Sequence, residues 1–258
     1  MAVLDQTQLG TIETHIEGGV AHIVFAHPAH NSLPGKLLAD LHQSILDVGS
    51  NPKARVVILE SAGDRTFCAG ASFDELMAIE NIEEGKAFFM GFARVINALR
   101  QIPQLVIGKV QGKAIGGGVG LASAVDYCLA TQFAAIKLSE LAIGIGPFVV
   151  GPAVARKVGV SAMSQLAIAA NEWRSAEWAK AHGLYAEIYE TKIELDVAVL
   201  DLAKNLSEYH PAAMQALKKT FWLGTENWDE LLSERAAISG ELVLSDFTKT
   251  AIQSFKKK

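Results

Sequence analysis

Cysteine and long apolar stretches are both scarce in this sequence. It has two cysteines, Cys68 and Cys128, in 258 residues, which excludes a disulfide framework and multi-cysteine metal sites. No uninterrupted apolar run approaches the roughly 20 residues that a transmembrane helix needs, because Gly, Asp or Lys breaks each candidate. We therefore expect a protein of a reducing compartment, with no metal site and no membrane span.

An excess of positive charge is also missing. The chain has 23 basic and 28 acidic side chains, a formal net charge of −5, so a broad nucleic-acid-binding surface is not expected. The first thirty residues contain Asp5, Glu13 and Glu17 but no arginine, and no basic segment leads into an apolar one. This pattern indicates neither a transit peptide nor a signal peptide, and it predicts a cytoplasmic protein.

Hydrophobic residues make up 50% of the chain, and their spacing predicts an α/β fold. Four short runs rich in Val and Ile are predicted strands: Val20–Phe25, Arg55–Glu60, Leu105–Val110 and Ala134–Leu138. Apolar residues recur at helical spacing in segments 37–48, 88–99, 200–206, 214–221, 233–244 and 250–255. Strands alternating with helices, followed by helices alone, predict an α/β core over residues 1–195 and a C-terminal helical region over residues 196–258.

Glycine is unevenly distributed along the chain. Nine of the 22 glycines lie between Leu105 and Gly151. The segment Gly108–Ala114 superficially resembles a P-loop, but its first spacing is one residue short, and Ala114 stands where a magnesium-binding hydroxyl is required. Gly116–Gly120 does not follow the order of a dinucleotide fingerprint, and no G-x-S-x-G nucleophile motif exists. These patterns exclude the usual nucleotide-binding and serine-hydrolase sites.

Two glycine-containing loops could bring backbone N–H groups to one ligand. Residues 110–122 (VQGKAIGGGVGLA) follow a predicted strand and open a helix. Glycine at a helix N-terminus lets an anionic oxygen approach free N–H groups. The second loop, Thr66–Glu75, places Gly70 between two alanines after another predicted strand. Together the loops could form an oxyanion hole; the alternative for the first loop is a tight strand–helix turn with glycines for packing.

These two loops resemble those of the crotonase superfamily, the enoyl-CoA hydratases and isomerases. The resemblance comprises FCAGA at 67–71 and V-x-G-x-A-x-G-G-G at 110–118, and it extends over nearly the whole chain. Further matching segments are NSL at 31–33, Asp126, the Glu140 to Gly146 loop, S-A-x-x-A-x-x-x-G-L at 175–184, and A-I-x-S-F at 251–255. The resemblance implies a spiral of ββα units with a helical C-terminal region, and a homotrimer or dimer of trimers. It also implies an acyl-CoA thioester substrate and no separate cofactor, because coenzyme A enters with the substrate.

The resemblance also implies roles for individual residues. The backbone N–H groups of Ala71 and Gly117 would hold the thioester oxygen, where negative charge develops as an enolate forms. Glu140 falls where many family members carry a catalytic glutamate, and an apolar pocket would raise its pKa toward neutrality. The structural alternative is a glutamate in the first turn of a helix capped by Ser139. Candidate substrate-binding residues are Ala69, Gly70, Ser72, Phe73, Gly116 and Gly120.

Gly120 departs from the family pattern. It falls where hydratases of the family carry a second glutamate, which helps to position and deprotonate water. One carboxylate suffices to move a proton between C2 and C4, so the departure favours double-bond isomerisation, with hydration of a 2-enoyl-CoA as the alternative. Another side chain could hold the water instead, with Asp74 and Glu75 as candidates. A remoter alternative is an acyl-CoA-binding or scaffold relative that has lost catalysis.

Two further groups of apolar residues have more than one interpretation. Phe148–Val150 stands where many hydratases are glycine-rich, so it forms either a wall of the acyl pocket or part of the core. Trp173 and the three later tryptophans are expected to pack in the core or at a subunit interface.

Overall fold

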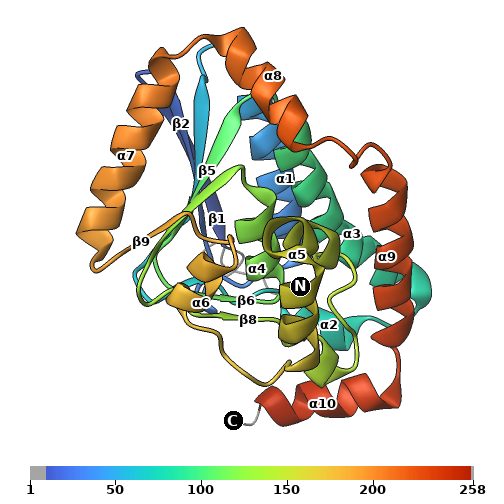
Figure 1. Cartoon of the computed structure of the whole chain (residues 1–258). Coiled ribbons are helices and arrows are strands. Elements are labelled where there is room, and N and C mark those ends of the chain that lie inside the picture. Colours follow the sequence, from blue (N-terminus) through green and yellow to red (C-terminus); the bar gives the residue numbers. More distant parts are fainter. Residues whose placement is uncertain (1–9, 257–258) are drawn as a thin grey trace.

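The computed structural model describes residues 10–256 of the chain (Figure 1). Its strands are β1 (Thr11–Glu17), β2 (Val20–Ala26), β3 (Val56–Ser61), β4 (Thr66–Cys68), β5 (Leu105–Val110), β6 (Lys113–Ile115), β7 (Tyr127–Thr131), β8 (Ile136–Lys137) and β9 (Glu187–Tyr189). Its helices are α1 (Gly35–Ser50), α2 (Phe73–Ala78), α3 (Ile82–Gln101), α4 (Gly117–Ala124), the 3₁₀ helix η2 (Leu141–Ile143), α5 (Gly151–Ile168), α6 (Ala176–Ala181), α7 (Lys192–Glu208), α8 (Pro211–Phe221), α9 (Trp228–Leu242) and α10 (Asp246–Lys256).

The strands form two sheets, and the chain alternates between them. The larger sheet has six strands in the order β1-β2-β3-β5-β7-β9, and the smaller has three in the order β4-β6-β8. β1 and β2 are antiparallel, whereas the other neighbouring pairs are parallel. From β3 to α5, a strand of the larger sheet is repeatedly followed by a strand of the smaller sheet and then by a helix. This repeat is the predicted ββα unit.

The smaller sheet determines where a ligand site can form. Because β4, β6 and β8 are parallel, the segments that follow them leave the sheet at the same edge. Ligands of α/β proteins bind outside the carboxyl ends of such strands. The three segments that meet there are 69–72, 116–117 and 138–140, which contain most of the candidate site residues.

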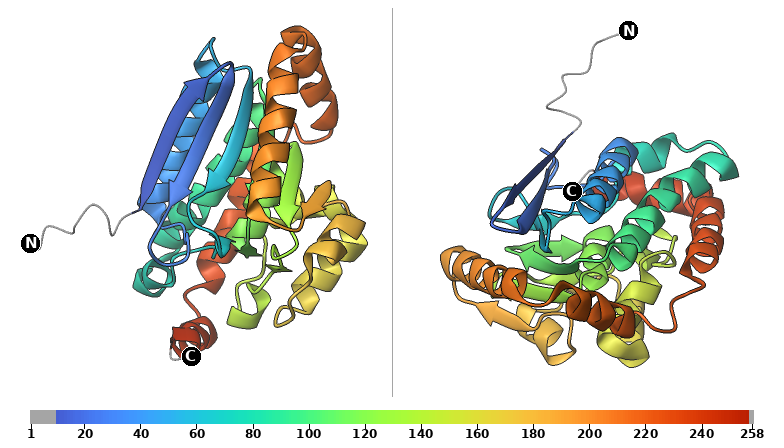
Figure 2. Two further views of the ribbon diagram at one scale, coloured as in Figure 1. Left: turned by 90° about the vertical axis from the view of Figure 1, so that its left-hand side faces the viewer. Right: turned by 90° about the horizontal axis from the view of Figure 1, so that it is seen from above.

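Alternate residues of the central strands belong to two separate cores. In β3, Val57 and Leu59 share a core with residues of α1 and α3. Val56 and Ile58 instead pack with a second group that includes Leu195 of α7. Figure 2 shows the same division from above, with the larger sheet between α1 and α3 on one side and α7 on the other. The period-2 alternation of a strand thus explains how one sheet supports both layers.

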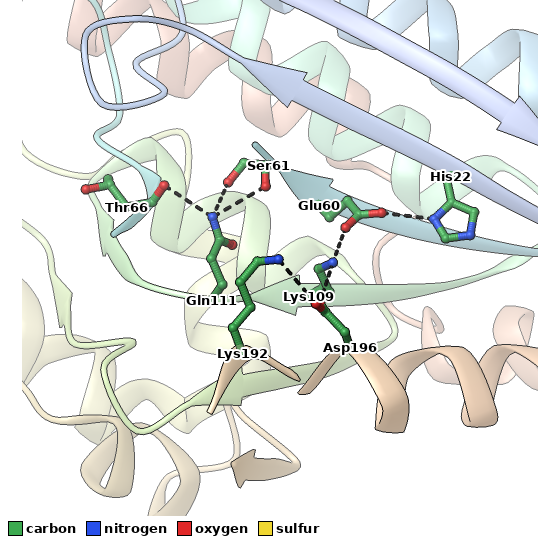
Figure 3. A network of polar contacts seen from close by, with 8 residues as sticks. All are labelled: His22, Glu60, Ser61, Thr66, Lys109, Gln111, Lys192 and Asp196. Carbon is green, nitrogen blue, oxygen red and sulfur yellow. Dashed lines mark hydrogen bonds and ion pairs between the residues drawn. The ribbon is translucent and has the colours of Figure 1, made fainter. Parts of the chain in front are cut away.

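Charged side chains hold α7 against the larger sheet (Figure 3). Lys109 of β5 forms ion pairs with Glu60 of β3 and with Asp196 of α7, the latter at 2.8 Å. The same Glu60 carboxylate contacts His22 Nδ1 at 2.9 Å. Loss of one partner of such a pair leaves an uncompensated charge. The network therefore fixes α7 to the sheet.

The C-terminal helices pack on the core and beside the edge of the smaller sheet. α9 lies along α3 so closely that a Cβ at Gly85 would be 2.6 Å from the Gly240 carbonyl oxygen. α10 lies against α2 and η2 (Figure 1). Beyond β9 the described chain is helical, as predicted, while the division between residues 195 and 196 stays a prediction, since α7 spans it. Among the described residues, no helix has the length and apolar character that crossing a membrane requires.

Candidate active site

Two glycine loops meet at the edge of the smaller sheet. Gly70 and Gly116 have positive φ angles of 84° and 53°, a conformation that other residues rarely adopt. A Cβ at Gly70 would lie 2.8 Å from the Ile115 carbonyl oxygen and 3.3 Å from the Gly117 nitrogen. Any side chain at position 70 would therefore push the two loops apart. The glycines bring the backbones of the 69–72 and 116–117 segments into contact.

The contact brings together two segments that each carry a candidate N–H donor. Gly117 is the first residue of α4, so its N–H has no partner within that helix, and the helix dipole favours negative charge there. Ala71 lies outside α2, directly before its N-cap Ser72. The ring of Phe92 packs against Gly117, with Cζ 2.9 Å from where a Cβ would be. Phe92 thereby fills the space that a side chain at position 117 would need.

The Glu140 carboxylate lies directly beside these loops. A Cβ at Gly116 would be 3.0 Å from Glu140 Oε1. Glu140 precedes η2 as its N-cap residue, but its side chain makes no capping hydrogen bond. Its Oε2 atom is buried and has no hydrogen-bond partner among the described residues. A buried acceptor without a partner is uncommon in folded proteins, and a catalytic role is one reason for such a group to occur.

Burial sets the protonation of this carboxyl group. Desolvation raises the pKa of Glu140 from 4.5 to about 7, and a backbone hydrogen bond acts in the opposite direction. At neutral pH the group is therefore present in both its acid and its base form. Such a group can accept a proton and return it, which is what general acid–base catalysis requires. The expectation of a pKa near neutrality thus has a physical cause in the structure.

The loops and the carboxylate line one cavity of about 310 Å³. This volume is at the lower end of ligand pockets, which span about 300–1,000 Å³. The cavity wall is mostly apolar and consists of Phe73, Leu76, Phe89, Phe92, Ile115, Ile143, Ile145, Pro147, Phe148, Val149 and Val150. Lys137, Ser139, Trp173 and Ser239 add polar or amphipathic groups. Among the described residues that line it, Glu140 is the one carboxylate.

Position 120 lies outside the cavity, behind Val150. A Cβ at Gly120 would overlap Val150 Cγ1 and would lie 2.7 Å from Val150 Cβ. Val150 itself is 5% exposed and lines the cavity. The valine side chain thus occupies the space into which a side chain at position 120 would extend.

The other two candidate carboxylates do not line the cavity. Glu75 Oε2 accepts a hydrogen bond of 2.6 Å from the Gly35 N–H, at the start of α1. Since Pro34, the N-cap of α1, provides no side-chain cap, Glu75 takes over that function. Asp74 lies beside it in the first turn of α2. Both residues lie in the first turn of α2.

The structure brings together most of the predicted site residues. Ala69, Gly70, Ala71, Phe73, Gly116, Gly117 and Glu140 line the cavity. Ser72 instead accepts a hydrogen bond from the Glu75 N–H as the cap of α2, and Gly120 packs under Val150. The predicted acyl-wall segment Phe148–Val150 does line the cavity, and so does Trp173, which was expected only to pack.

Sequence reasoning missed the contribution of α3 and α9 to the site. Phe89 and Phe92 come from α3, and Ser239 comes from α9. The two phenylalanines belong to an apolar helical stripe that indicates burial but not proximity to a ligand. Ser239 carries no local signal at all. Among the described residues, no group of three or more His, Cys, Asp or Glu side chains could hold a metal ion.

Comparison with known proteins identifies the family. The sequence model of the family described as enoyl-CoA hydratase/isomerase matches residues 15–258. The peroxisomal Delta(3,5)-Delta(2,4)-dienoyl-CoA isomerase of Arabidopsis thaliana is 27% identical, over 97% of this chain and 95% of its own length. The mitochondrial methylglutaconyl-CoA hydratase of Homo sapiens is 30% identical, over 88% of this chain and 67% of its own length.

Solved structures show the same fold. An enoyl-CoA hydratase from Mycobacterium avium superposes with a TM-score of 0.83 at 26% identity, covering 95% of this chain and 96% of that one. An enoyl-CoA hydratase from Bacillus halodurans reaches a TM-score of 0.87 at 22% identity, covering 94% and 99%. The predicted crotonase fold is therefore confirmed. With these matches over nearly its whole length, the chain belongs to the enoyl-CoA hydratase/isomerase family of the crotonase superfamily.

Proposed function

We propose that this protein isomerises the double bond of an enoyl-CoA through a thioester enolate, with Glu140 as the single proton carrier. The observation that carries the proposal is the cavity's one carboxylate, combined with the valine that fills the space beside Gly120. A hydratase of the usual family type uses two carboxylates around one water. Here a second carboxylate at position 120 has no room.

The proposed reaction needs two proton transfers at one carboxyl group. The Glu140 carboxylate removes a proton from C2 of a 3-enoyl-CoA, and the electron pair spreads into a dienolate. Its negative oxygen accepts hydrogen bonds from the N–H groups of Ala71 and Gly117, which stabilise the enolate more than the neutral carbonyl. The Glu140 carboxylic acid then returns the proton to C4, leaving the double bond between C2 and C3. The pKa of about 7 suits both transfers.

A side-by-side assay of 3-enoyl- and 2-enoyl-CoA substrates tests the proposal. We expect the wild type to isomerise the former, and Glu140→Gln to lower kcat/KM by about 10²–10⁴-fold, the usual contribution of a general acid–base group. Glu83→Gln is the matched control, because Glu83 is exposed in the first turn of α3. Fast hydration that survives Glu140→Gln would show that the carboxylate is misassigned. Strong, Glu140-dependent hydration without isomerisation would make hydration the function.

Proton exchange distinguishes an enzyme from an acyl-CoA-binding relative without activity. A saturated acyl-CoA incubated with the protein in D₂O should gain deuterium at C2, because enolate formation needs no double bond in the substrate. The Glu140→Gln variant should bind the same thioester without exchange. Binding without exchange by the wild type would favour the non-catalytic alternative.

A homotrimer or dimer of trimers and a cytoplasmic location are also part of the proposal. Both derive from the sequence and the family resemblance. The outer face of α7 supports association, since Ile193, Val197 and Leu200 are 76%, 54% and 49% exposed and lie at helical spacing on one stripe. Light scattering on the purified protein gives the number of subunits directly.

A further inference from the structure

Two lysines lie close to a partly exposed tryptophan that lines the cavity. Lys137 and Trp173 both line the cavity. The Lys137 ammonium lies 5.7 Å from the centre of the Trp173 ring, and the Lys113 ammonium lies 5.1 Å from it. Trp173 is 42% exposed. The aromatic face thus holds two cations beside the mostly apolar wall of the cavity.

Among the residues that the structure describes, neither ammonium group has a negatively charged partner. Lys113 and Lys137 form hydrogen bonds through their backbones, to Arg65 and Gly116, but no ion pair or hydrogen bond of their side chains joins them to the described residues. The nearby Arg174, by contrast, pairs with Glu172 at 3.3 Å. Lys113 is exposed, whereas Lys137 is half-buried. A half-buried lysine without a carboxylate beside it provides an open site for an anion.

The order of the smaller sheet places this site relative to the thioester. The oxyanion donors follow β4 and β6, and Glu140 follows β8. Beyond β8, Arg174 pairs with Ile136 across the outer edge of the sheet, which puts Trp173 next to that edge. From β4 outward, the order of groups along the edge of the sheet is therefore the Ala71 donor, the Gly117 donor, the Glu140 carboxylate and Trp173. An acyl chain held at the donors and passing Glu140 extends toward Trp173 and Lys137.

We propose that Lys137, with Lys113 and Trp173, binds a carboxylate at the far end of a short acyl chain. The proposal rests on the proposed acyl-CoA function and names its substrate class as CoA thioesters of dicarboxylic acids. The phosphates of coenzyme A are the other source of negative oxygens on such a ligand. They belong to the opposite end of the thioester from the terminus of the acyl chain.

The chemistry explains why a lysine here would select such substrates. A carboxylate placed in an apolar cavity without a partner loses its hydration and gains nothing in return. An ammonium group within hydrogen-bond reach offsets that loss, and a hydrogen bond to a charged group typically changes an equilibrium by tenfold or more. Trp173 limits the motion of the lysine stems, so less side-chain freedom is lost on binding.

Calorimetric binding of unreactive thioesters tests the proposal independently of catalysis. The ligands are saturated dicarboxylic CoA thioesters of four to six carbons, each compared with the monocarboxylic thioester of the same length and with free CoA. For at least one length, the wild type should bind the dicarboxylic ligand at least as tightly as its neutral counterpart. Lys137→Met should reduce the ratio of the two affinities about tenfold, and Lys137→Arg should restore most of it.

Lys53→Met provides the matched control, because Lys53 is an exposed lysine outside the cavity, and it should leave the ratio unchanged. A preference of the wild type for the neutral ligand at every length would overturn the proposal. If Lys137→Met lowered the affinity equally for the dicarboxylic ligand, the neutral ligand and free CoA, the proposal would also be overturned, since Lys137 would then contact a phosphate. Failure to bind any thioester would instead refute the acyl-CoA function itself.

Discussion

The Val150 side chain occupies the space that a side chain at position 120 would need. We therefore expect that a side chain can be placed at either position but not at both. The perturbation is a pair of substitutions, Gly120→Glu and Val150→Gly, made singly and together. A Cβ at position 120 would overlap Val150 Cγ1 and lie 2.7 Å from its Cβ. Both atoms belong to a branched, 5% exposed side chain at the start of α5. Neither atom is the end of a flexible chain that could move aside.

The structure gives the expected sizes of the three effects. Gly120→Glu alone overpacks this contact, which costs about 1–3 kcal/mol and more if the new carboxyl is buried. Val150→Gly alone removes a buried side chain and adds backbone freedom, together about 2–4 kcal/mol. In the double variant, the new side chain at position 120 fills the space left by Val150, so neither the overpacking nor the cavity remains in full. The double variant should therefore be about 2 kcal/mol more stable than the sum of the single effects.

Urea unfolding of the four proteins measures this coupling, and a hydration assay measures its consequence. The double variant should hydrate a 2-enoyl-CoA faster than the wild type. The glutamate introduced at position 120 adds a second carboxylate near Glu140, and removal of the Val150 side chain leaves room for a water molecule between them. Gly120→Glu alone should not gain hydration. If that single variant is as stable as the wild type, or if the coupling free energy is zero, then Val150 does not fill the space and the reasoning fails.

Glu140, Lys218 and Val197 each lead to a further measurable effect. Glu140 has a pKa of 4.5 unfolded and about 7 folded, so the folded state loses stability as pH rises through this window. In urea unfolding, the free energy of unfolding of Glu140→Gln minus that of the wild type should therefore be about 2 kcal/mol larger at pH 8 than at pH 5. An equal difference at the two pH values would contradict the pKa shift. The kcat/KM for isomerisation should rise with pH to a plateau with an apparent pKa near 7, since the carboxylate is the base; a profile flat from about pH 6 to 8 would exclude this group. Lys218 is 3% exposed and contacts Asp126 Oδ2 at 3.1 Å and two backbone carbonyl oxygens. Lys218→Met should thus lower the free energy of unfolding by about 3–5 kcal/mol, whereas the exposed neighbour Lys219→Met should change it little. Finally, Val197→Lys on the exposed stripe of α7 should reduce the mass measured by light scattering if that face joins subunits, and an unchanged oligomer would place the interface elsewhere.

Elements with a clear apolar period could be predicted from the sequence. Leu37, Leu41, Ile45 and Val48 are all buried on one face of α1, and β5 runs over Leu105–Val110 as expected. Of the smaller sheet, only β8 was predicted, as the longer run Ala134–Leu138. β4 and β6 could not be found in this way, because they have three residues each. A period of two needs more residues than that to be recognised.

The same contrast holds for the site. Gly70 and Gly116 were recognisable because positions that need a positive φ or a close backbone approach select glycine, and that choice is visible in the sequence. The wall of the cavity was not recognisable, because Phe92 and Ser239 reach it only through the packing of α9 along α3. Side chains from distant segments acquire a functional position through tertiary contacts alone, and no local pattern records it.

Gly120 shows most clearly what a sequence leaves open about chemistry. A glycine in place of a carboxylate has two opposite consequences for a reaction. If the vacated space is empty, it can hold a water molecule, and another group nearby could still activate that water. If the space is filled by a neighbour, water is kept from the reacting carbons and the remaining carboxylate acts alone. The sequence at position 120 is identical in both cases. The difference depends on Val150, thirty residues later, whose side chain packs over Gly120 because α4 and α5 are in contact. The reaction of a family member is therefore determined by pairs of positions, and a missing catalytic residue can be interpreted only together with the residue that takes its space.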